Sequence, residues 1–339
     1  MKKYLFFTAV ILLAVSFLQP ETFAQRTKLA QSGMKFISAP TDARATGMGE
    51  TFTAITSNSA GLFYNPASMA FGDTKMDAAI GVNKWIADIN YLYASASFQP
   101  GDPAWGKFGV SLVSVNYGDL QATVVDGSTE RGYRDVGTFS PTAFSIGLGY
   151  ANALSEKFSV GGQVKWVHQN LGVSPMSIDP TTKELLSEEN KLGVLAFDFG
   201  IFYKTGFKSL NFGMSVRNFS TEIKYKEDGF QLPLNFKIGV AMDMVDLVPD
   251  LAKQHSFLLA VDVSHPRDYP EQLYIGAEYS FMKWVFLRGG VSFPNDEKQY
   301  NLGFGLRPEL EGVKLAIDYA YTPFGIFSSV HNFTVRFEY

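Results

Sequence analysis

From about residue 77 to the last residue, large apolar side chains alternate with small or polar ones. In the final segment, Phe333, Val335 and Phe337 alternate with Thr334 and Arg336. Successive side chains of a β-strand point to opposite faces, so this period of two predicts strands with one apolar and one polar face. About fourteen such segments follow one another, many close to the 9–11 residues of a tilted membrane strand. The predicted strands are 77–84, 89–99, 106–118, 141–151, 157–169, 194–204, 210–219, 233–242, 255–265, 272–281, 284–293, 298–307, 313–321 and 330–338.

The composition favours a membrane barrel over a soluble sandwich. The chain is 46% hydrophobic and 18% charged, with 30 Phe and 16 Tyr, yet its mean hydropathy is +0.00. A soluble sandwich would have to bury an unusually Phe-rich face in each sheet. In a wide membrane cylinder the large residues contact lipid, while Gly, Ser, Asn and charged residues face the interior. We therefore predict an all-β fold, a transmembrane antiparallel β-barrel of about 14 strands. The charges expected inside are Asp198, Arg217, Lys237, Asp262, Glu278, Arg288, Arg307, Asp318 and Arg336.

The first 24 residues have the three parts of a secretory signal peptide. Lys2 and Lys3 precede an apolar run over 5–18, and Thr22-Phe23-Ala24 supplies small residues at a cleavage site. A single membrane anchor is the alternative, but the run is short for about 30 Å of hydrocarbon. We predict a signal peptide over 1–24, a hatch segment over 25–76 and a barrel over 77–339.

The hatch segment is rich in small residues and does not alternate. Gly47 and Gly49 permit tight turns, and Asn65-Pro66 interrupts any local helix. Small side chains let a backbone pack closely against a barrel wall, so this segment is a candidate plug. Inward-facing wall charges would then pair with one another or with the plug, for instance with Arg44. The alternative is a periplasmic tail outside the lumen.

Two motifs in this segment resemble a known family. The run ARATGMG over 43–49 and the run NPAS over 65–68 are similar to those of the PorV/PorQ family of outer-membrane proteins, which belongs to the FadL-like barrel superfamily. The resemblance implies a fourteen-stranded barrel with an N-terminal hatch, in which 65–67 forms the "NPA" turn. It also implies a role beside the type IX secretion system, where such proteins bind the C-terminal signal domains of cargo and hand them to a surface attachment complex. The hatch-motif residues are Asp42, Arg44, Gly47, Met48, Gly49, Asn65, Pro66 and Ala67.

Connection lengths predict which end of the barrel faces outward. The connections 119–140, 170–193 and 220–232 are long, whereas 152–156, 205–209 and 282–283 are short. Outer-membrane barrels have short periplasmic turns and longer outer loops, so the long connections are expected outside. They would carry the leading function, the binding of secreted proteins. The alternative function is transport of a hydrophobic small molecule, with Trp284 and Phe286 as lumen contacts.

Several function classes are disfavoured. The net charge of −4 supplies no basic face for nucleic acid, and the absence of Cys removes thiolate metal sites and cysteine nucleophiles. His168 and His331 lie at expected outer strand ends, near Ser174 and Asn332, but they form no recognisable catalytic or metal motif. We therefore expect neither an enzyme nor a metal or cofactor site, and a location in the bacterial outer membrane in contact with lipid.

Two finer expectations concern the early strands. Tyr91 and Tyr93 lie near a strand end and are expected in an aromatic girdle at the lipid headgroups. Around Leu112 and Val113 the alternation shifts phase, which predicts a β-bulge.

Overall fold

The computed structural model describes residues 32–178, 182, 185–248, 254–295, 298, 300–310 and 313–339. The predicted signal peptide, 1–24, lies outside these residues. No helix within the described ranges is long and apolar enough to span a bilayer.

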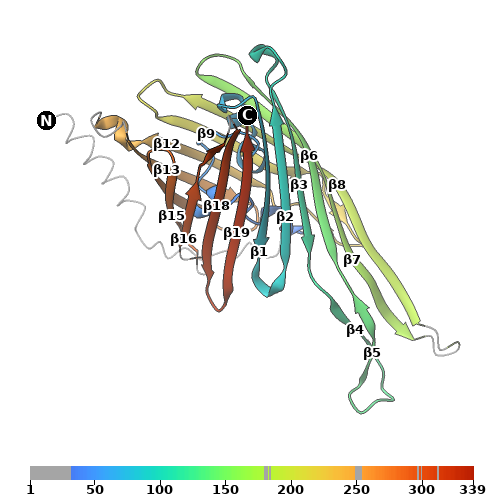
Figure 1. Cartoon of the computed structure of the whole chain (residues 1–339). Coiled ribbons are helices and arrows are strands. Elements are labelled where there is room, and N and C mark those ends of the chain that lie inside the picture. Colours follow the sequence, from blue (N-terminus) through green and yellow to red (C-terminus); the bar gives the residue numbers. More distant parts are fainter. Residues whose placement is uncertain are drawn as a thin grey trace.

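Antiparallel strands form one closed cylinder (Figure 1). The described residues give a 15-stranded sheet, in which the short β17 (Glu309–Leu310) pairs only with β18; the other fourteen strands close the barrel through the pairs β1–β19 and β16–β18. All fourteen predicted strands are therefore confirmed. The barrel strands are β1 (Met76–Lys84), β2 (Asn90–Phe98), β3 (Lys107–Asn116), β6 (Thr142–Ala153), β7 (Phe158–Ile178), β8 (Leu185–Lys204), β9 (Asn211–Ser220), β12 (Asn235–Asp243), β13 (His255–Pro266), β14 (Gln272–Phe281), β15 (Val285–Phe293), β16 (Asn301–Leu306), β18 (Val313–Phe324) and β19 (Phe327–Glu338).

The wall is apolar outside and polar inside. Along β1, exposed and buried residues alternate strictly, with Ile80 and Val82 outside and Asp77 and Asn83 inside. The same alternation turns large apolar residues of most other strands outward, where a bilayer can contact them. Inside, small residues and charges line the wall, as the sequence predicts.

The two ends of the barrel differ in the length of their connections. At one end, 154–157, 205–210 and 282–284 are short; at the other, three consecutive long connections rise from β3 to β12. The first carries a hairpin of β4 (Leu120–Val125) and β5 (Tyr133–Phe139), the second extends β7 and β8 to 21 and 20 residues, and the third carries β10 (Ile223–Lys224) and β11 (Gly229–Phe230). We call this the long-hairpin end. In Figure 1 the β4–β5 hairpin reaches far below the turn between β18 and β19.

The described part of the predicted hatch segment, residues 32–75, lies against the inner wall (Figure 1, blue). It contains η1 (Lys35–Ser38), α2 (Ala43–Gly47), α3 (Gly61–Tyr64) and η2 (Pro66–Phe71). The connecting helices are η3 (Ile86–Asp88), η4 (Pro103–Trp105) and η5 (Met244–Leu247). Phe52 and Tyr64 are buried together, with ring centroids 5.3 Å apart, and they belong to a hydrophobic core shared with the wall. We refer to residues 32–75 as the hatch.

This shared core explains two wrong expectations. Tyr91 and Tyr93 do not face the headgroups; both are buried inside, where Tyr93 packs edge-on against Phe63 at 6.1 Å between ring centroids. The pairing of β3 with β2 and β6 has no register shift, so no bulge occurs at Leu112 and Val113. Val113 is simply an inward apolar residue in the shared core. Large apolar residues on both faces imitate a phase shift.

Candidate functional site

The first hatch motif begins with a capped turn that is bonded to the wall. The Asp42 carboxylate accepts hydrogen bonds from the amides of Arg44 and Ala45, at 3.0 and 3.2 Å, and so caps the short helix α2. Its other oxygen accepts from Arg336 of β19 at 2.7 Å, and the same guanidinium bonds Asp77 of β1 at 2.5 Å. Arg336 therefore joins two wall strands to the hatch.

Arg44 begins a second network of buried charges. It donates two hydrogen bonds to the Glu278 carboxylate of β14, at 2.7 and 2.9 Å, which is the expected pairing with a wall charge. Arg288 also donates to Glu278, at 2.5 Å, and to Asp318, at 2.7 Å. Arg307 completes this network by donating a hydrogen bond to Asp318 at 2.9 Å. Three arginines thus share two carboxylates, so that each arginine and each carboxylate has an oppositely charged neighbour.

The glycines of this motif provide close backbone contact. A Cβ atom at Gly47 would lie 2.9 Å from the Cα atom of Gly303 in β16, so a larger residue cannot fit without movement. Gly49 has a φ of +67°, a left-handed conformation that glycine adopts at little cost. Met48 between them is fully buried in the shared core. The motif therefore fixes the hatch against β15, β16 and β18.

The second motif, 65–67, forms a turn against other strands of the wall. The Asn65 side chain accepts from the Ala67 amide at 3.1 Å and donates to the carbonyl of Ile201 in β8 at 3.0 Å. Pro66 starts η2, where its missing N–H is not needed. Ser159 of β7 donates to the Ala67 carbonyl at 2.8 Å. All eight predicted hatch-motif residues thus lie where the hatch meets the wall. They form two groups, and each group contacts different strands of the wall.

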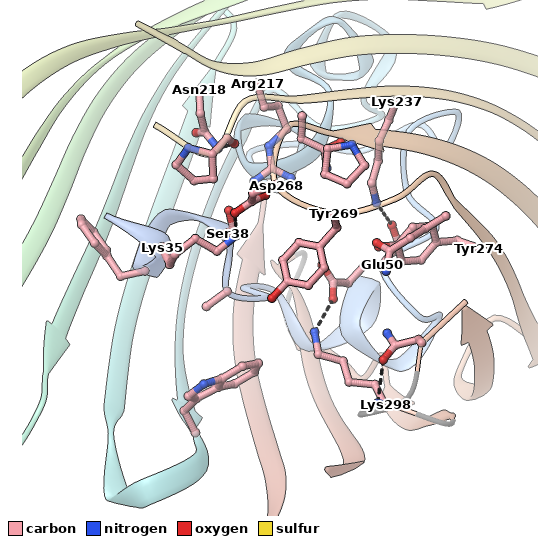
Figure 2. A pocket seen from close by; sticks show the side chains of 18 of the residues that line it. Lys35, Ser38, Glu50, Arg217, Asn218, Lys237, Asp268, Tyr269, Tyr274 and Lys298 are labelled. Carbon is pink, nitrogen blue, oxygen red and sulfur yellow. Dashed lines mark hydrogen bonds and ion pairs between the residues drawn. The ribbon is translucent and has the colours of Figure 1, made fainter. Parts of the chain in front are cut away.

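A cavity of about 720 Å³ lies inside the barrel near the long-hairpin end (Figure 2). None of the eight hatch-motif residues is among its lining residues, and Glu50 follows directly after the first motif. The residues that line it are Lys35, Phe36, Ser38, Ala39, Glu50, Trp85, Ile89, Tyr91, Tyr117, Gln169, Arg217, Asn218, Pro233, Asn235, Lys237, Pro266, Asp268, Tyr269, Pro270, Gln272, Tyr274, Pro294, Asn295, Lys298 and Phe324.

Ion pairs and cation–π contacts shape this cavity. Glu50 lies between two lysines: Lys298 is 3.3 Å from its carboxylate, and Lys237 donates to its backbone carbonyl at 3.1 Å. Burial by itself would raise the pKa of Glu50, but the two ammonium groups outweigh this and lower it. Lys237 also lies over the Tyr274 ring, 4.1 Å from its centroid, and Lys35 pairs with Asp268. Figure 2 shows both lysine contacts to Glu50.

The two predicted lumen contacts do not line this cavity. Trp284 precedes β15 in a short turn and is 54% exposed. Phe286 lies between two guanidinium groups, 5.4 Å from Arg288 and 4.9 Å from Arg307. Their part in ligand binding stays a prediction. Sequence reading placed Arg217 and Lys237 inside, but it did not connect Lys35, Glu50 and Lys298 with them, because these five residues come from distant segments.

The histidines make local contacts only. His331 bonds the Tyr319 hydroxyl at 2.8 Å, and its other nitrogen is 3.5 Å from the Ser329 oxygen, at the limit of a hydrogen bond. His168 packs against Phe144 at 5.2 Å between ring centroids. Within the residues described, no group of three or more His, Cys, Asp or Glu side chains could hold a metal ion.

The fold resembles that of solved outer-membrane barrels. The Pseudomonas putida toluene transporter TodX superposes with a TM-score of 0.57 at 14% identity, over 86% of this chain and 96% of that one. A Pseudomonas aeruginosa FadL homologue gives 0.54 at 13% identity, over 89% and 98% of the two chains. The CymD monoaromatic hydrocarbon channel gives 0.53 at 12% identity, over 88% and 96%. No curated protein sequence matches the chain.

Fourteen antiparallel strands, an outward apolar surface and these structural relatives define a FadL-like β-barrel of the bacterial outer membrane. Residues 22–253 match the family described as type IX secretion system protein PorV. The chain belongs to the PorV family.

Proposed function

We propose that this barrel binds proteins secreted by the type IX system as they arrive at the outer membrane and passes them to other components at the cell surface. The observation that carries this proposal is the family match over residues 22–253. It acts by binding, and we propose no enzymatic activity for it.

The long-hairpin end supports such a role. Its three long connections rise side by side, because β3, β6, β7, β8, β9 and β12 are consecutive neighbours in the sheet. Beyond Asn170, where β7 ceases to pair with β6, apolar side chains remain exposed, among them Met176 at 58%. Val125, in β4 of the neighbouring hairpin, is 88% exposed. The strands β4 and β7 are in contact, and a contiguous exposed apolar patch is typical of surfaces that bind another protein.

A test compares two sets of substitutions at the long-hairpin end. Val125→Ser combined with Met176→Ser removes apolar surface from the tall side, and Ile326→Ser is the matched control on the low β18–β19 turn, where Ile326 is 97% exposed. Each protein is purified gently from its native membrane, and co-eluting proteins are identified by mass spectrometry. We expect secretion components and cargo C-terminal domains with the parent and the control, and at least fivefold less with the double variant. A parent protein that recovers none of them would contradict the proposal.

The alternative function is transport of a hydrophobic small molecule. The superposing structures include proteins described as a toluene transporter and a monoaromatic hydrocarbon channel, but at 12–14% identity they inform the fold alone. The charges around the cavity favour the binding role, because a hydrocarbon would exclude solvent from them, including from Arg217, which has no ion pair among the described residues. Transport predicts toluene uptake that falls when Asn65→Ala loosens the hatch. Equal uptake by cells with and without the protein would remove this alternative.

A further inference from the structure

Arg217 points into the lumen in phase with Gly213 and Ser215 of β9, and a β-bulge turns its neighbour Asn218 inward as well. On β8, Phe197 pairs with Phe219 of β9 and Phe199 pairs with Val216, so Arg217 and Asn218 together face the one residue Asp198. Asn218 has a φ of +62°, as an extra residue in a bulge often requires. As a result both neighbours reach the same cavity, although adjacent strand residues normally point to opposite faces.

The carboxylate nearest to the bulge is already occupied. Asp198 accepts from the Asn218 amide at 2.7 Å and pairs with Lys165 at 2.7 Å. Lys165 in turn donates to the Asn218 side chain at 2.6 Å. Arg217 takes no part in these hydrogen bonds or in this ion pair.

Arg217 therefore differs from the other lumen arginines. Arg44, Arg288, Arg307 and Arg336 each pair with a carboxylate at 2.9 Å or less. Among the residues that the structure describes, Arg217 has no ion pair or hydrogen bond, and its Nε atom is buried. Its guanidinium carbon lies 5.7 Å from the centre of the Tyr64 ring. A buried donor without an acceptor is costly, so an anionic ligand would stabilise it.

The cavity as a whole has an excess of positive charge. Its described lining includes four cations, Lys35, Arg217, Lys237 and Lys298, and two carboxylates, Glu50 and Asp268. Each carboxylate already faces a lysine. Lys237 also interacts electrostatically with the buried carboxylate of Asp262, which does not line the cavity. The charge left without an ion pair is therefore that of Arg217, and an anionic group such as a phosphate monoester would compensate it.

The remaining lining suits a polar body rather than a hydrocarbon tail. Five Tyr or Trp rings, which carry polar atoms, line it beside two Phe rings, and Ile89 is the one branched aliphatic residue among the described lining. Tyrosine and tryptophan offer a flat apolar face together with a hydrogen-bonding group. A hydrocarbon chain would instead require an aliphatic sleeve and would desolvate the lysines.

We propose that this cavity binds a small, water-soluble organic phosphate, with the Arg217 guanidinium as the main contact to the phosphoryl group. Lys237 and Lys298 flank the site, and the tyrosine rings contact the polar body of the ligand. The ligand approaches from the long-hairpin end, because residues from five connections at that end line the cavity. This site is separate from the hairpins proposed to bind secreted proteins, so either proposal can fail without the other.

The test is calorimetric titration of the full chain in detergent at low ionic strength, with glucose 6-phosphate as probe and glucose as the uncharged control. We expect binding of glucose 6-phosphate and at least tenfold weaker binding of glucose. Arg217→Met should weaken glucose 6-phosphate binding at least tenfold, whereas Arg134→Met, which removes an exposed arginine of β5, should leave it unchanged. Arg217→Lys keeps the charge without the planar fork and should fall between them.

The outcomes separate the site from its alternatives. Gel mobility of boiled and unboiled samples shows whether each variant keeps its folded barrel; if Arg217→Met does not, Lys298→Met takes its place, with an expected loss of threefold or more. Binding of decanoate or toluene in place of glucose 6-phosphate would overturn the proposal. So would equal affinity of folded Arg217→Met and the parent, or no binding of either glucose 6-phosphate or inorganic phosphate at millimolar concentration.

Discussion

Single side chains of the inner wall are shared between a strand and the hatch. Arg336 bonds Asp42 of the hatch and Asp77 of β1, and all three side chains are buried. The Asp77 carboxylate also accepts from the Ser59 amide of the hatch at 3.1 Å. Such a cluster contributes little when complete, but it is costly when one member is missing, because the remaining charges stay buried.

Arg336→Met should therefore destabilise the protein strongly. Removing the guanidinium leaves two buried carboxylates without a counter-charge, and we expect a loss of about 3–5 kcal/mol in the free energy of unfolding. Urea unfolding in detergent, followed by tryptophan fluorescence, measures it. Arg134→Met removes an exposed arginine and should change the same free energy by less than about 0.5 kcal/mol. A loss below about 1 kcal/mol for Arg336→Met would show that the cluster is not buried as described.

Glu50 should make stability depend on pH. Its lowered pKa means that the folded protein favours the ionised carboxylate, so its contribution is present above the ordinary value of 4.5 and fades as the pH falls below it. Glu50→Gln removes this contribution. We expect the variant to be less stable than the parent at pH 7, with a difference that shrinks at acidic pH.

Thermal unfolding of both proteins between pH 7 and pH 3 measures the Glu50 effect. Glu130→Gln is a suitable control, because Glu130 is exposed in the β4–β5 hairpin. A difference between Glu50→Gln and the parent that stays constant down to pH 3 would exclude the lysine contacts as its cause.

For the wall charges, the sequence predicted which side chains point into the lumen, since a period of two assigns each residue to one face of the wall. Glu278, Arg288 and Asp318 were correctly placed inside. Their partners were not predictable beyond Arg44, because pairing depends on which distant strands become neighbours. Arg217 was also placed inside, but its lack of a partner arises from a bulge that two strands create together.

At the scale of elements, the alternation located all fourteen barrel strands but not their full length. β7 and β8 were expected over 157–169 and 194–204, yet they continue to Ile178 and begin at Leu185. Beyond the membrane both faces of a hairpin meet water, so its sequence, with Glu188, Glu189 and Asn190, no longer alternates between apolar and polar residues. The sequence pattern reports the lipid boundary rather than the end of the strand.

The extension of β7 and β8 should be dispensable for barrel stability. Past Asn170, β7 pairs with β8 alone, and β9 pairs with β8 only from Ala196 onward. Replacing 171–190 by an Asn-Gly turn should keep the melting temperature within about 3 °C of the parent, since few wall contacts are lost. Differential scanning calorimetry in detergent measures this. Replacing the same number of residues within 158–169 and 192–199 instead should prevent folding, and a shortened hairpin that also fails to fold would contradict the expectation.

At the scale of the whole molecule, the apolar surface faces outward over the height of the wall. Leu148, near the middle of β6, is 67% exposed, and Leu154, in the turn after β6, is 62% exposed. Similar exposure therefore corresponds to two environments, the centre of the bilayer and its edge.

Arginine substitutions should distinguish these two depths. Leu148→Arg should cost about 2–4 kcal/mol on folding into lipid vesicles, and Leu154→Arg at most about 1 kcal/mol. The comparison uses the free energy of unfolding from vesicles in guanidinium. Equal effects of the two substitutions would mean that the outward surface does not contact lipid as described.

The candidate site was predictable in part. The hatch motifs pointed to residues that attach the segment 32–75 to the wall, whereas the cavity combines residues from the hatch and five wall connections. Tyr91 and Val113 show why. The hatch and the wall share an apolar core, and an inward apolar residue cannot be distinguished from a lipid-facing one without knowing what fills the lumen. The alternation of the sequence therefore predicts the barrel wall better than it predicts the hatch and the cavity inside the barrel.

The tall connections all rise from one arc of the cylinder. Seen from the side (Figure 1), the molecule is therefore asymmetric: the connections between β3 and β12 are tall, whereas the β18–β19 turn on another part of the wall is low. A partner that binds these tall connections therefore approaches the barrel from one side. Neighbouring copies in a crowded membrane would then need to rotate before they could share such a partner, so in-plane rotation, as well as lateral diffusion, would set the rate at which complexes assemble.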